Sequence, residues 1–319
     1  MRNKRPTIAL GQMVLDTVIH NNQVNHIVNS QLLGGPPSFA GIVGFILSKM
    51  YSWISSPLIY AYTCPQAIDL LKTYPEFSKI MINLKLRPKC PQFRLNYLDN
   101  KNERILSLKN PPLQFNPKDF NWDLGKPAVA IIGSIFHEFK DPEIFTFLKK
   151  RCCYIAFDPQ GCFRHLTSER TIEFTYWWDP KIIKNVDCLH VSDLESKLLG
   201  FGEDPFKIVD EILETPITSV ILTRGRSGAI LGFKDNYKKR IFNVPAYLEG
   251  KVIDETGAGD IFQFAFVTHL LAFRDEINAA AFATSVTSLF LEQKRPFKAL
   301  SKNRIQLRQE KIKTQIIES

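Results

Sequence analysis

The chain lacks any long uninterrupted run of apolar residues. The two longest candidates, residues 39–47 and 261–273, are short or are broken by polar residues such as Gln263. A membrane-spanning helix needs about 20 predominantly apolar residues, and the basic first residues are not followed by the apolar core of a signal peptide. We therefore expect a soluble protein that has no membrane partner and works in the cytoplasm.

Cysteine and histidine are sparse and show no metal-binding spacing. No Cys-x-x-Cys pair occurs, and the six histidines form no metalloenzyme motif. The six cysteines are Cys64, Cys90, Cys152, Cys153, Cys162 and Cys188. Adjacent cysteines cannot easily bridge to each other without strain, so we interpret all six as free thiols in a reducing compartment.

Two common nucleotide-binding motifs are also missing. The sequence contains no Gly-x-x-x-x-Gly-Lys-Ser/Thr, which excludes a P-loop. No Gly-x-Gly-x-x-Gly follows the first predicted strand, which argues against a dinucleotide-binding Rossmann site.

Negative charge is lacking at the C-terminal end. Between residues 294 and 313, eight basic residues face the single acid Glu310, so this stretch carries +7 of the net charge of +9. Such a segment could contact nucleic acid or an anionic surface. Because only Phe297 interrupts it as an aromatic residue, we prefer a solvated terminal helix or a frayed tail. The near-neutral remainder makes nucleic acid an unlikely partner.

What is present is an alternation of apolar strands and helices in a chain of 319 residues with 45% hydrophobic content, enough for one large domain. Buried strands are predicted at 7–11, 58–62, 129–133, 154–158, 188–192 and 219–223. Helices are predicted from Ser38 as a cap to about 50, and at 67–73, 142–150, 194–199, 205–213, 261–273 and 278–292. Repeated strand–helix units favour an α/β fold with a doubly wound, mostly parallel sheet flanked by helices.

One region departs from this pattern. In residues 92–109, Phe93, Leu95 and Tyr97 alternate with polar residues, and a polar turn leads to a second alternating run. That is typical of a hairpin with one solvated face. We expect segments of about 14–33 and 92–109 to form a small β lid inserted in a main domain of residues 7–295. Residues 296–319 form the basic C-terminal segment.

The most informative stretch is Asp-Glu-Thr-Gly-Ala-Gly-Asp at residues 254–260, which lies directly before a long apolar helix. A helix N-terminus presents unpaired N–H groups and the positive end of the helix dipole, and glycines let a phosphate approach closely. A carboxylate would repel that phosphate. Its presence makes sense if it accepts the proton of a hydroxyl that attacks the phosphate.

This stretch, continued by Ile261 and Phe262, resembles the C-terminal signature of the ribokinase-like (pfkB) family of carbohydrate and nucleoside kinases. The resemblance implies that Asp260 is the general base and that the amides of Gly257, Ala258 and Gly259 form an anion hole. It also places Thr256 at the nucleotide, whereas Glu255 stands where the family often has Thr. The alternative is that Asp260 only caps the helix, but the full motif favours catalysis.

Further residues resemble the family's acceptor site. Gly34-Gly35 matches its N-terminal Gly-Gly signature, with Ser38 in the zone where members commonly carry Asn. Asp16 matches the aspartate that holds substrate hydroxyls, and Arg164 follows a loop similar to one that faces the substrate. Taken alone, the paired glycines are equally well a loop breaker and Asp16 a turn former.

The donor site resembles the family in two places. Thr223, Gly225 and Gly228 match a strand–turn that lies against the nucleotide phosphates, although a hairpin turn explains the same letters. Ser192 and Glu195 resemble an Asn-x-x-Glu element that positions Mg²⁺ largely through water, with Ser in place of Asn. A helix capping box has the same Ser-x-x-Glu sequence pattern.

The resemblance implies a phosphotransferase that moves the γ-phosphoryl group of ATP·Mg²⁺ to a hydroxyl of a small sugar, polyol or nucleoside. It also implies a monovalent cation as a further cofactor and a homodimer through the lid in some members. Two alternatives stay open: a catalytically silent nucleotide or metabolite sensor on the same fold, and nucleic-acid contact through the basic segment.

Overall fold

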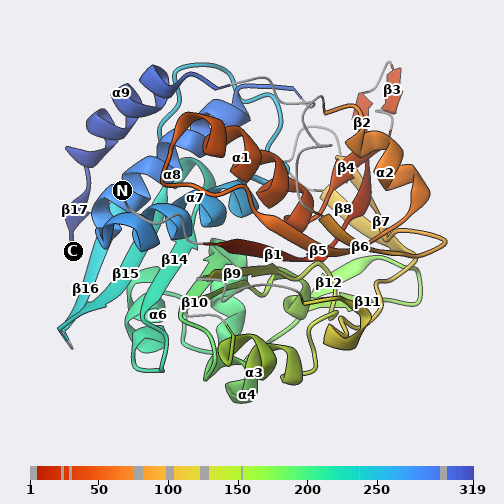
Figure 1. Cartoon of the computed structure of the whole chain (residues 1–319), viewed down its shortest axis with the longest axis horizontal. Helices are drawn as coiled ribbons and strands as arrows, with labels where there is room; N and C mark the ends of the chain where they lie inside the picture. Colours follow the sequence, from red (N-terminus) through yellow and green to blue (C-terminus); the bar gives the residue numbers. More distant parts are fainter. Residues whose placement is uncertain are drawn as a thin grey trace.

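A central sheet of ten strands forms the body of the protein, as seen in the computed structural model (Figure 1). The structure describes residues 6–22, 25–28, 31–74, 82–97, 104–122, 129–151, 154–236, 238–294 and 300–319. In sheet order the strands are β17 (Ile317–Glu318), β16 (Lys238–Val244), β15 (Ala229–Asp235), β14 (Ser219–Thr223), β13 (Cys188–Ser192), β10 (Tyr154–Asp158), β9 (Val129–Gly133), β1 (Thr7–Gln12), β5 (Leu58–Thr63) and β6 (Ile82–Leu86). Pairing is parallel from β14 to β6 and antiparallel from β14 to β17, which confirms the predicted mostly parallel sheet.

Helices cover both faces of this sheet (Figure 1). One face carries α1 (Pro36–Met50), α7 (Ala258–Phe273) and α8 (Glu276–Leu291), and the other carries α3 (Glu143–Lys149), α4 (Pro180–Ile183) and α6 (Pro205–Leu213). Because side chains alternate along a strand, β1 sends Ala9 into the core under α1 and α7, and Ile8 and Leu10 into the core under α3 and α6. Burial on both faces explains why these strands are continuously apolar.

Helix α1 begins earlier than predicted. Its N-cap is Gly35, with Pro36 as the first helical residue, so Ser38 lies inside the helix and does not cap it. Proline is favoured at this position because its missing N–H would have no intrahelical acceptor there.

A second sheet of five strands packs at one end of the central sheet. It consists of β3 (Asn25–Val28), β2 (Val14–Asn22), β7 (Gln92–Tyr97), β8 (Arg104–Lys109) and β4 (Leu32–Gly34). These strands come from the segments that the sequence assigns to a lid, and we call them the lid sheet. Its inner face buries Phe93, Leu95, Leu106 and Leu108 against Ile135 of the main domain. The hairpin of β11 (Arg164–Leu166) and β12 (Ile172–Phe174) bridges to β8 through Thr171 and Ser107.

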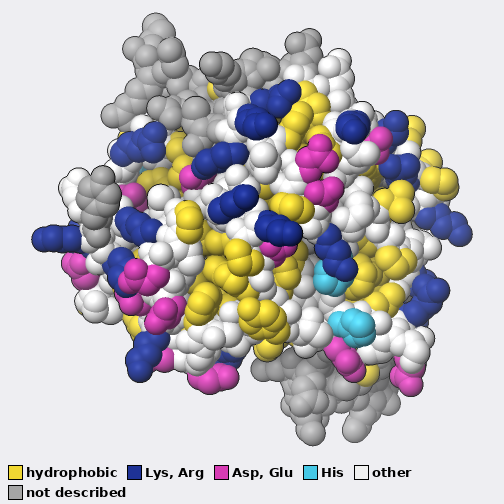
Figure 2. Space-filling model, turned by 90° about the horizontal axis from the view of Figure 1, so that it is seen from below, with side chains coloured by type: hydrophobic (Ala, Val, Ile, Leu, Met, Phe, Trp, Pro, Cys, Tyr) yellow, Lys and Arg dark blue, Asp and Glu magenta, His cyan; other side chains and the backbone are white. Residues whose placement is uncertain are grey.

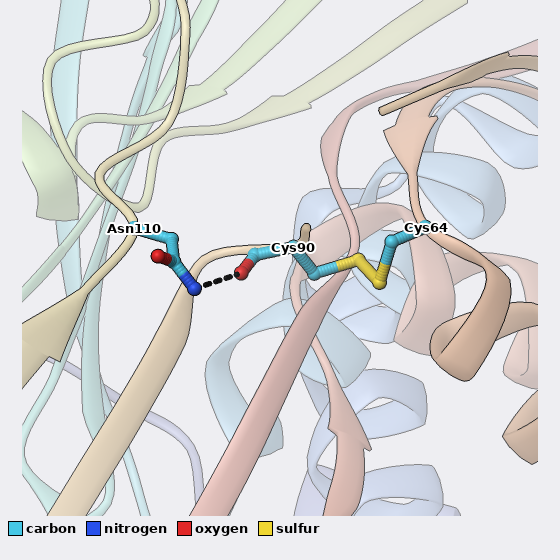
Figure 3. The surroundings of a disulfide bond; sticks show 3 residues. All are labelled: Cys64, Cys90 and Asn110. Carbon is cyan, nitrogen blue, oxygen red and sulfur yellow. Dashed lines mark hydrogen bonds between the residues drawn. A yellow bond between two sulfur atoms is a disulfide. The ribbon is translucent and has the colours of Figure 1, made fainter. Parts of the chain in front are cut away.

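Cys64 and Cys90 form a disulfide, so the prediction that all cysteines are free thiols is wrong for this pair (Figure 3). Cys64 follows β5 and is the N-cap residue of α2 (Pro65–Leu71), and Cys90 lies just before β7. The bond therefore ties the central sheet to the base of the lid sheet. Cys162 and Cys188 are free and buried, and the pair 152–153 lies outside the described residues.

Over its described residues, the basic C-terminal segment contains the expected terminal helix with mostly exposed side chains, but one face of this helix is buried, so the segment is not a frayed tail. Helix α9 (Lys302–Lys313) packs against α8 and buries Ile305, Arg308 and Ile312, and β17 then extends the central sheet. Over the residues that the structure describes, no helix has the length and apolar character to cross a membrane. On the face shown in Figure 2, acidic side chains lie among the basic ones, and the basic ones form no single stripe.

Candidate active site

The glycine turn before α7 sets the geometry of the candidate site. Gly257 is the N-cap residue, with a left-handed φ of 79°, and no side chain caps the helix. Asp260 therefore lies in the first turn and is not a capping residue, which removes the capping alternative. A Cβ at Gly257 would lie 2.6 Å from the ring of Phe39, so both the backbone angle and the space require glycine.

The backbone N–H groups of this turn differ in whether they are free to bind an anion. The N–H of Ala258 donates to the carbonyl of Glu255 at 3.2 Å, and the N–H of Ile261 donates to the carbonyl of Gly257 at 2.9 Å. By their place in the first turn, the N–H groups of Gly259 and Asp260 have no intrahelical acceptor. They are the best-placed donors for an anion at the positive end of the helix.

A first cavity of about 200 Å³ opens in front of Asp260, between the main domain and the lid sheet. Of the predicted acceptor residues, Asp16, Gly35 and Arg164 line it, together with Asp260 and the 255–259 turn. Apolar side chains of the lid sheet, Phe93, Leu95 and Leu106, complete its wall. We call this the acceptor cavity.

Two predicted acceptor residues do not line this cavity. Gly34 pairs with Val14, and the space that its side chain would occupy is filled by the Asp16 carboxylate. Ser38 is buried inside α1, and its hydroxyl has no hydrogen-bond partner among the described residues.

A second cavity of about 270 Å³ lies on the other side of the same turn. It is lined by the predicted donor residues Thr223, Gly225 and Gly228, and its remaining wall is mostly apolar: Pro245, Ala246, Tyr247, Leu248, Val252, Phe262 and Leu291. We call this the donor cavity. Thr256, predicted at the nucleotide, lines the acceptor cavity instead.

The two cavities share one wall, made of Glu255, Ala258 and Gly259. The positive end of α7 and the Asp260 carboxylate thus stand where contents of the two cavities would meet. This arrangement suits transfer of an anionic group from one cavity to the other.

The surroundings of Asp260 raise the pKa of its carboxyl group. Burial raises its pKa to about 8, the carboxylates of Asp158 and Asp16 add to the increase, and His190 and Arg164 act in the opposite direction. A carboxylate with a pKa near neutral is a stronger proton acceptor than an ordinary one.

Arg164 is a buried cation of the acceptor cavity. Its guanidinium donates from Nη1 to the carbonyl of Ile135 at 2.8 Å and lies 5.0 Å from the centre of the Phe93 ring. These contacts fix the guanidinium between β9, whose chain continues into Ile135, and the lid sheet. An arginine held in this way is suited to orient an acceptor oxygen or anion.

Glu195 lies outside both cavities and forms a capping box with Ser192. The Ser192 N–H donates to Oε2 of Glu195 at 2.8 Å, and the Glu195 N–H donates to the Ser192 hydroxyl at 3.4 Å. Within the described ranges, no group of three His, Cys, Asp or Glu residues is arranged to hold a metal. A Mg²⁺ ion at this site would therefore take most of its ligands from phosphates and water, which is its usual preference.

Sequence reasoning placed Asp158 at the start of the loop that precedes Arg164 without giving it a role, and it missed His190 as a site residue. Asp158 ends β10 and lines the acceptor cavity, and its Oδ2 lies 2.8 Å from Nδ1 of His190 on β13. The available signal was a histidine inside an otherwise apolar buried strand. Its partner, however, is 32 residues away in the chain.

A protein-family model and a curated relative each match part of the chain. Residues 192–302 match the model of the pfkB family carbohydrate kinases. A nucleoside kinase of Methanocaldococcus jannaschii is 26% identical over 188 residues, which is 57% of this chain and 53% of that protein. The matched segment thus spans about half the length of this curated relative.

Solved structures match over nearly the whole chain. A pyrophosphate-dependent kinase in the ribokinase family, complexed with a pyrophosphate analog and myo-inositol, superimposes with a TM-score of 0.75 at 16% identity, covering 94% of this chain and 99% of that one. Ribokinase from Thermotoga maritima gives a TM-score of 0.70 at 15% identity, with 96% and 99% covered.

The fold is thus that of the ribokinase-like kinases. The family match over residues 192–302 carries the glycine turn and Asp260, and it confirms the resemblance to the pfkB family that the motifs indicate.

Proposed function

We propose that this protein is a kinase that transfers the γ-phosphoryl group of ATP to a hydroxyl of a small sugar, polyol or nucleoside. One observation carries the proposal. The acceptor and donor cavities meet at the first turn of α7, where Asp260 faces the acceptor cavity and Gly259 belongs to the walls of both.

In the proposed reaction, Asp16 holds acceptor hydroxyls and Asp260 takes the proton of the hydroxyl that attacks. The amides of Gly259 and Asp260, with the dipole of α7, stabilise charge on the transferring phosphoryl group. The lid sheet places Phe93 and its apolar neighbours over the acceptor, which excludes water and limits ATP hydrolysis.

The donor cavity supports a nucleotide as the donor. Its apolar wall around Tyr247 and Leu248 suits a flat base. Thr223 contacts His190, on which the glycine turn rests, and phosphates would sit there. Mg²⁺ would supply charge neutralisation on the phosphates, with Glu195 orienting its water. A monovalent cation is part of the same proposal.

The cytoplasm as location and a homodimer as assembly belong to the same proposal. Use of ATP supports the cytoplasm, and the Cys64–Cys90 disulfide is the observation that argues against it, because disulfides persist in oxidising compartments. The lid sheet ends at β3, an edge to which a second copy of the chain would add to give a homodimer. Cell fractionation and analytical ultracentrifugation test these two points.

The kinase proposal is tested by measuring ADP release with ATP over ribose, fructose, fructose phosphate, inositols and nucleosides. We expect one acceptor class to give phosphorylated product, and Asp260→Asn to lower kcat at least about a hundredfold while ATP still binds. Asp193→Asn is the matched control, since Asp193 is 46% exposed on α5 (Asp193–Ser196) and lines neither cavity. Near-normal turnover of Asp260→Asn would refute the base assignment, and wild-type protein without product would refute the kinase.

A further inference from the structure

His190 is a buried histidine between the two cavities. It lies on β13, in the middle of the central sheet, and its side chain is only 3% exposed. A buried imidazole costs free energy unless its polar atoms are paired. The hydrogen-bond partners of the His190 imidazole therefore indicate its role.

The two ring nitrogens face residues of different cavities. Nδ1 lies 2.8 Å from Oδ2 of Asp158, which lines the acceptor cavity. Nε2 lies 3.4 Å from the hydroxyl of Thr223, which lines the donor cavity. The imidazole thus connects the two cavities beneath the wall that they share.

The ring also touches that wall directly. A Cβ at Gly259 would lie 2.9 Å from Cε1 of His190, so the backbone of the first turn of α7 rests on the imidazole. Gly259 is the residue whose amide we assign to the transferring phosphoryl group. The position of that amide consequently depends on the ring below it.

The charges around the ring favour a protonated imidazole. An ionised carboxylate can only accept, so Nδ1 donates to Asp158, whose other oxygen accepts the N–H of Gln160 at 2.9 Å. Burial acts to lower the pKa of His190, but Asp158 on β10, Glu195 on α5 and Asp260 on α7 together raise it above its usual value. In the imidazolium, Nε2 also donates, and the Thr223 hydroxyl accepts.

We propose that His190 is a positioning residue of the phosphoryl-transfer site. It holds Asp158 and Thr223 in fixed relation beneath Gly259, and its positive charge offsets the surrounding carboxylates where an anionic phosphoryl group must pass. This inference rests on the proposed kinase function, since it gives His190 a role in that reaction.

The charge and the packing make separable predictions. Without a cation at this position, Asp260 would lose one of the groups that lower its pKa, so ionised Asp260 would appear only at higher pH. A residue that merely fills space would change stability, and would lower kcat equally at all pH values. The pH profile of kcat therefore distinguishes the two roles.

The test compares His190→Gln with the wild type and with His165→Gln, a matched control at an exposed residue of β11 that lines neither cavity. We expect His190→Gln to lower kcat roughly tenfold at neutral pH and to move the acidic limb of the kcat profile upward by about one pH unit. His165→Gln should keep the wild-type profile. An acidic limb at its wild-type position in His190→Gln would overturn the proposal.

A second measurement needs no activity. This measurement is a proton–carbon NMR titration of histidine-labelled protein. The imidazole signal of His190 is the one that is missing from the spectrum of His190→Gln. If His190→Gln does not fold, the signal that Asp158→Asn shifts most identifies His190. We expect the pKa of this imidazole to lie above its usual value in the wild type and to fall in Asp158→Asn. A pKa at or below the usual value in the wild type would overturn the inference even if the kinase proposal holds. Conversely, a raised pKa of this imidazole in a protein without turnover would refute the kinase proposal alone.

Discussion

Arg308 offers a quantitative test of how the C-terminal helix supports the donor cavity. Its side chain is 1% exposed, and Nη1 donates to the hydroxyl of Ser288 at 2.7 Å. Nη2 lies 2.9 Å from both Oε2 of Glu249 and Oε2 of Glu292. Glu292 in turn accepts the N–H groups of Glu249 and Gly250 at 3.0 and 2.9 Å. The guanidinium therefore fixes the loop that carries Tyr247 and Leu248 into the donor cavity.

The perturbation is Arg308→Met, which keeps an apolar stem and removes the charge. Removing one partner of a buried ion pair costs roughly 3 to 5 kcal/mol, because the other charge stays buried and unpaired. Glu292 is only 11% exposed, but Glu249 is 42% exposed and can be hydrated, so we expect the lower end, about 3 kcal/mol. At about 2 to 4 °C per kcal/mol for a large domain, the melting temperature should fall by roughly 6 to 12 °C.

Arg304→Met is the matched control. Arg304 contacts the same Glu292 at 3.4 Å but is 53% exposed, so its ion pair contributes less than about 1 kcal/mol. Urea unfolding gives the free energy of unfolding of both variants, and steady-state kinetics give the KM for ATP. Arg308→Met should lose stability and bind ATP more weakly with little change in the acceptor KM. Equal stability of the two variants would refute this reasoning.

Three further predictions concern charge, backbone and covalent linkage. Because the pKa of Asp260 is raised to about 8, the wild type should lose stability as the pH rises from about 4 to 8. Asp260→Asn should therefore have a melting temperature several degrees above that of the wild type at pH 8 but not at pH 4. Scanning fluorimetry that gives the same difference in melting temperature at both pH values would contradict this. Gly257→Ala should destabilise the fold and abolish turnover. Gly225 is also at positive φ but has open space around it, so Gly225→Ala should lower the free energy of unfolding in urea by only about 1 to 2 kcal/mol. Similar losses in the two variants would show that the contact of a residue-257 Cβ with the Phe39 ring is unimportant. The disulfide closes a separation of 26 residues, so Cys64→Ser should lose roughly 3 kcal/mol, and a reductant should lower the melting temperature of the wild type alone; an equal response of both proteins would refute the contribution.

Much of the frame could be predicted because it depends on local patterns. The six apolar strands and the helix at 205–213 follow from runs and periodicities that neighbouring residues create, and all are present. The 92–109 hairpin could be predicted because apolar and polar residues alternate along its strands, which gives it one solvated face. Some strands were missed, among them β6 and β17, which form the two edges of the central sheet. β6 has partly exposed side chains, and β17 has only two residues. Neither leaves a clear apolar signal.

The helix starts were predicted less well. Ser38 and Ile261 were expected at the beginnings of helices that in fact begin at Pro36 and Ala258. In both cases a glycine with positive φ is the N-cap residue, and the sequence gives no direct sign of that angle. The observed start matters at α7, because a helix that begins at Ala258 places Asp260 within its first turn, where Asp260 does not cap the helix.

By itself the sequence determined the alternating α/β frame and the glycine turn with its carboxylate, since each depends on residues that are adjacent in the chain. Only the tertiary structure decided that the turn before Asp260 forms a wall between two cavities, that His190 meets Asp158 and Thr223 beneath Gly259, and that Cys64 bonds to Cys90. The physical reason is that a parallel sheet brings the carboxyl ends of distant strands to one edge. The contacts made there join residues tens of positions apart, and no local pattern records them.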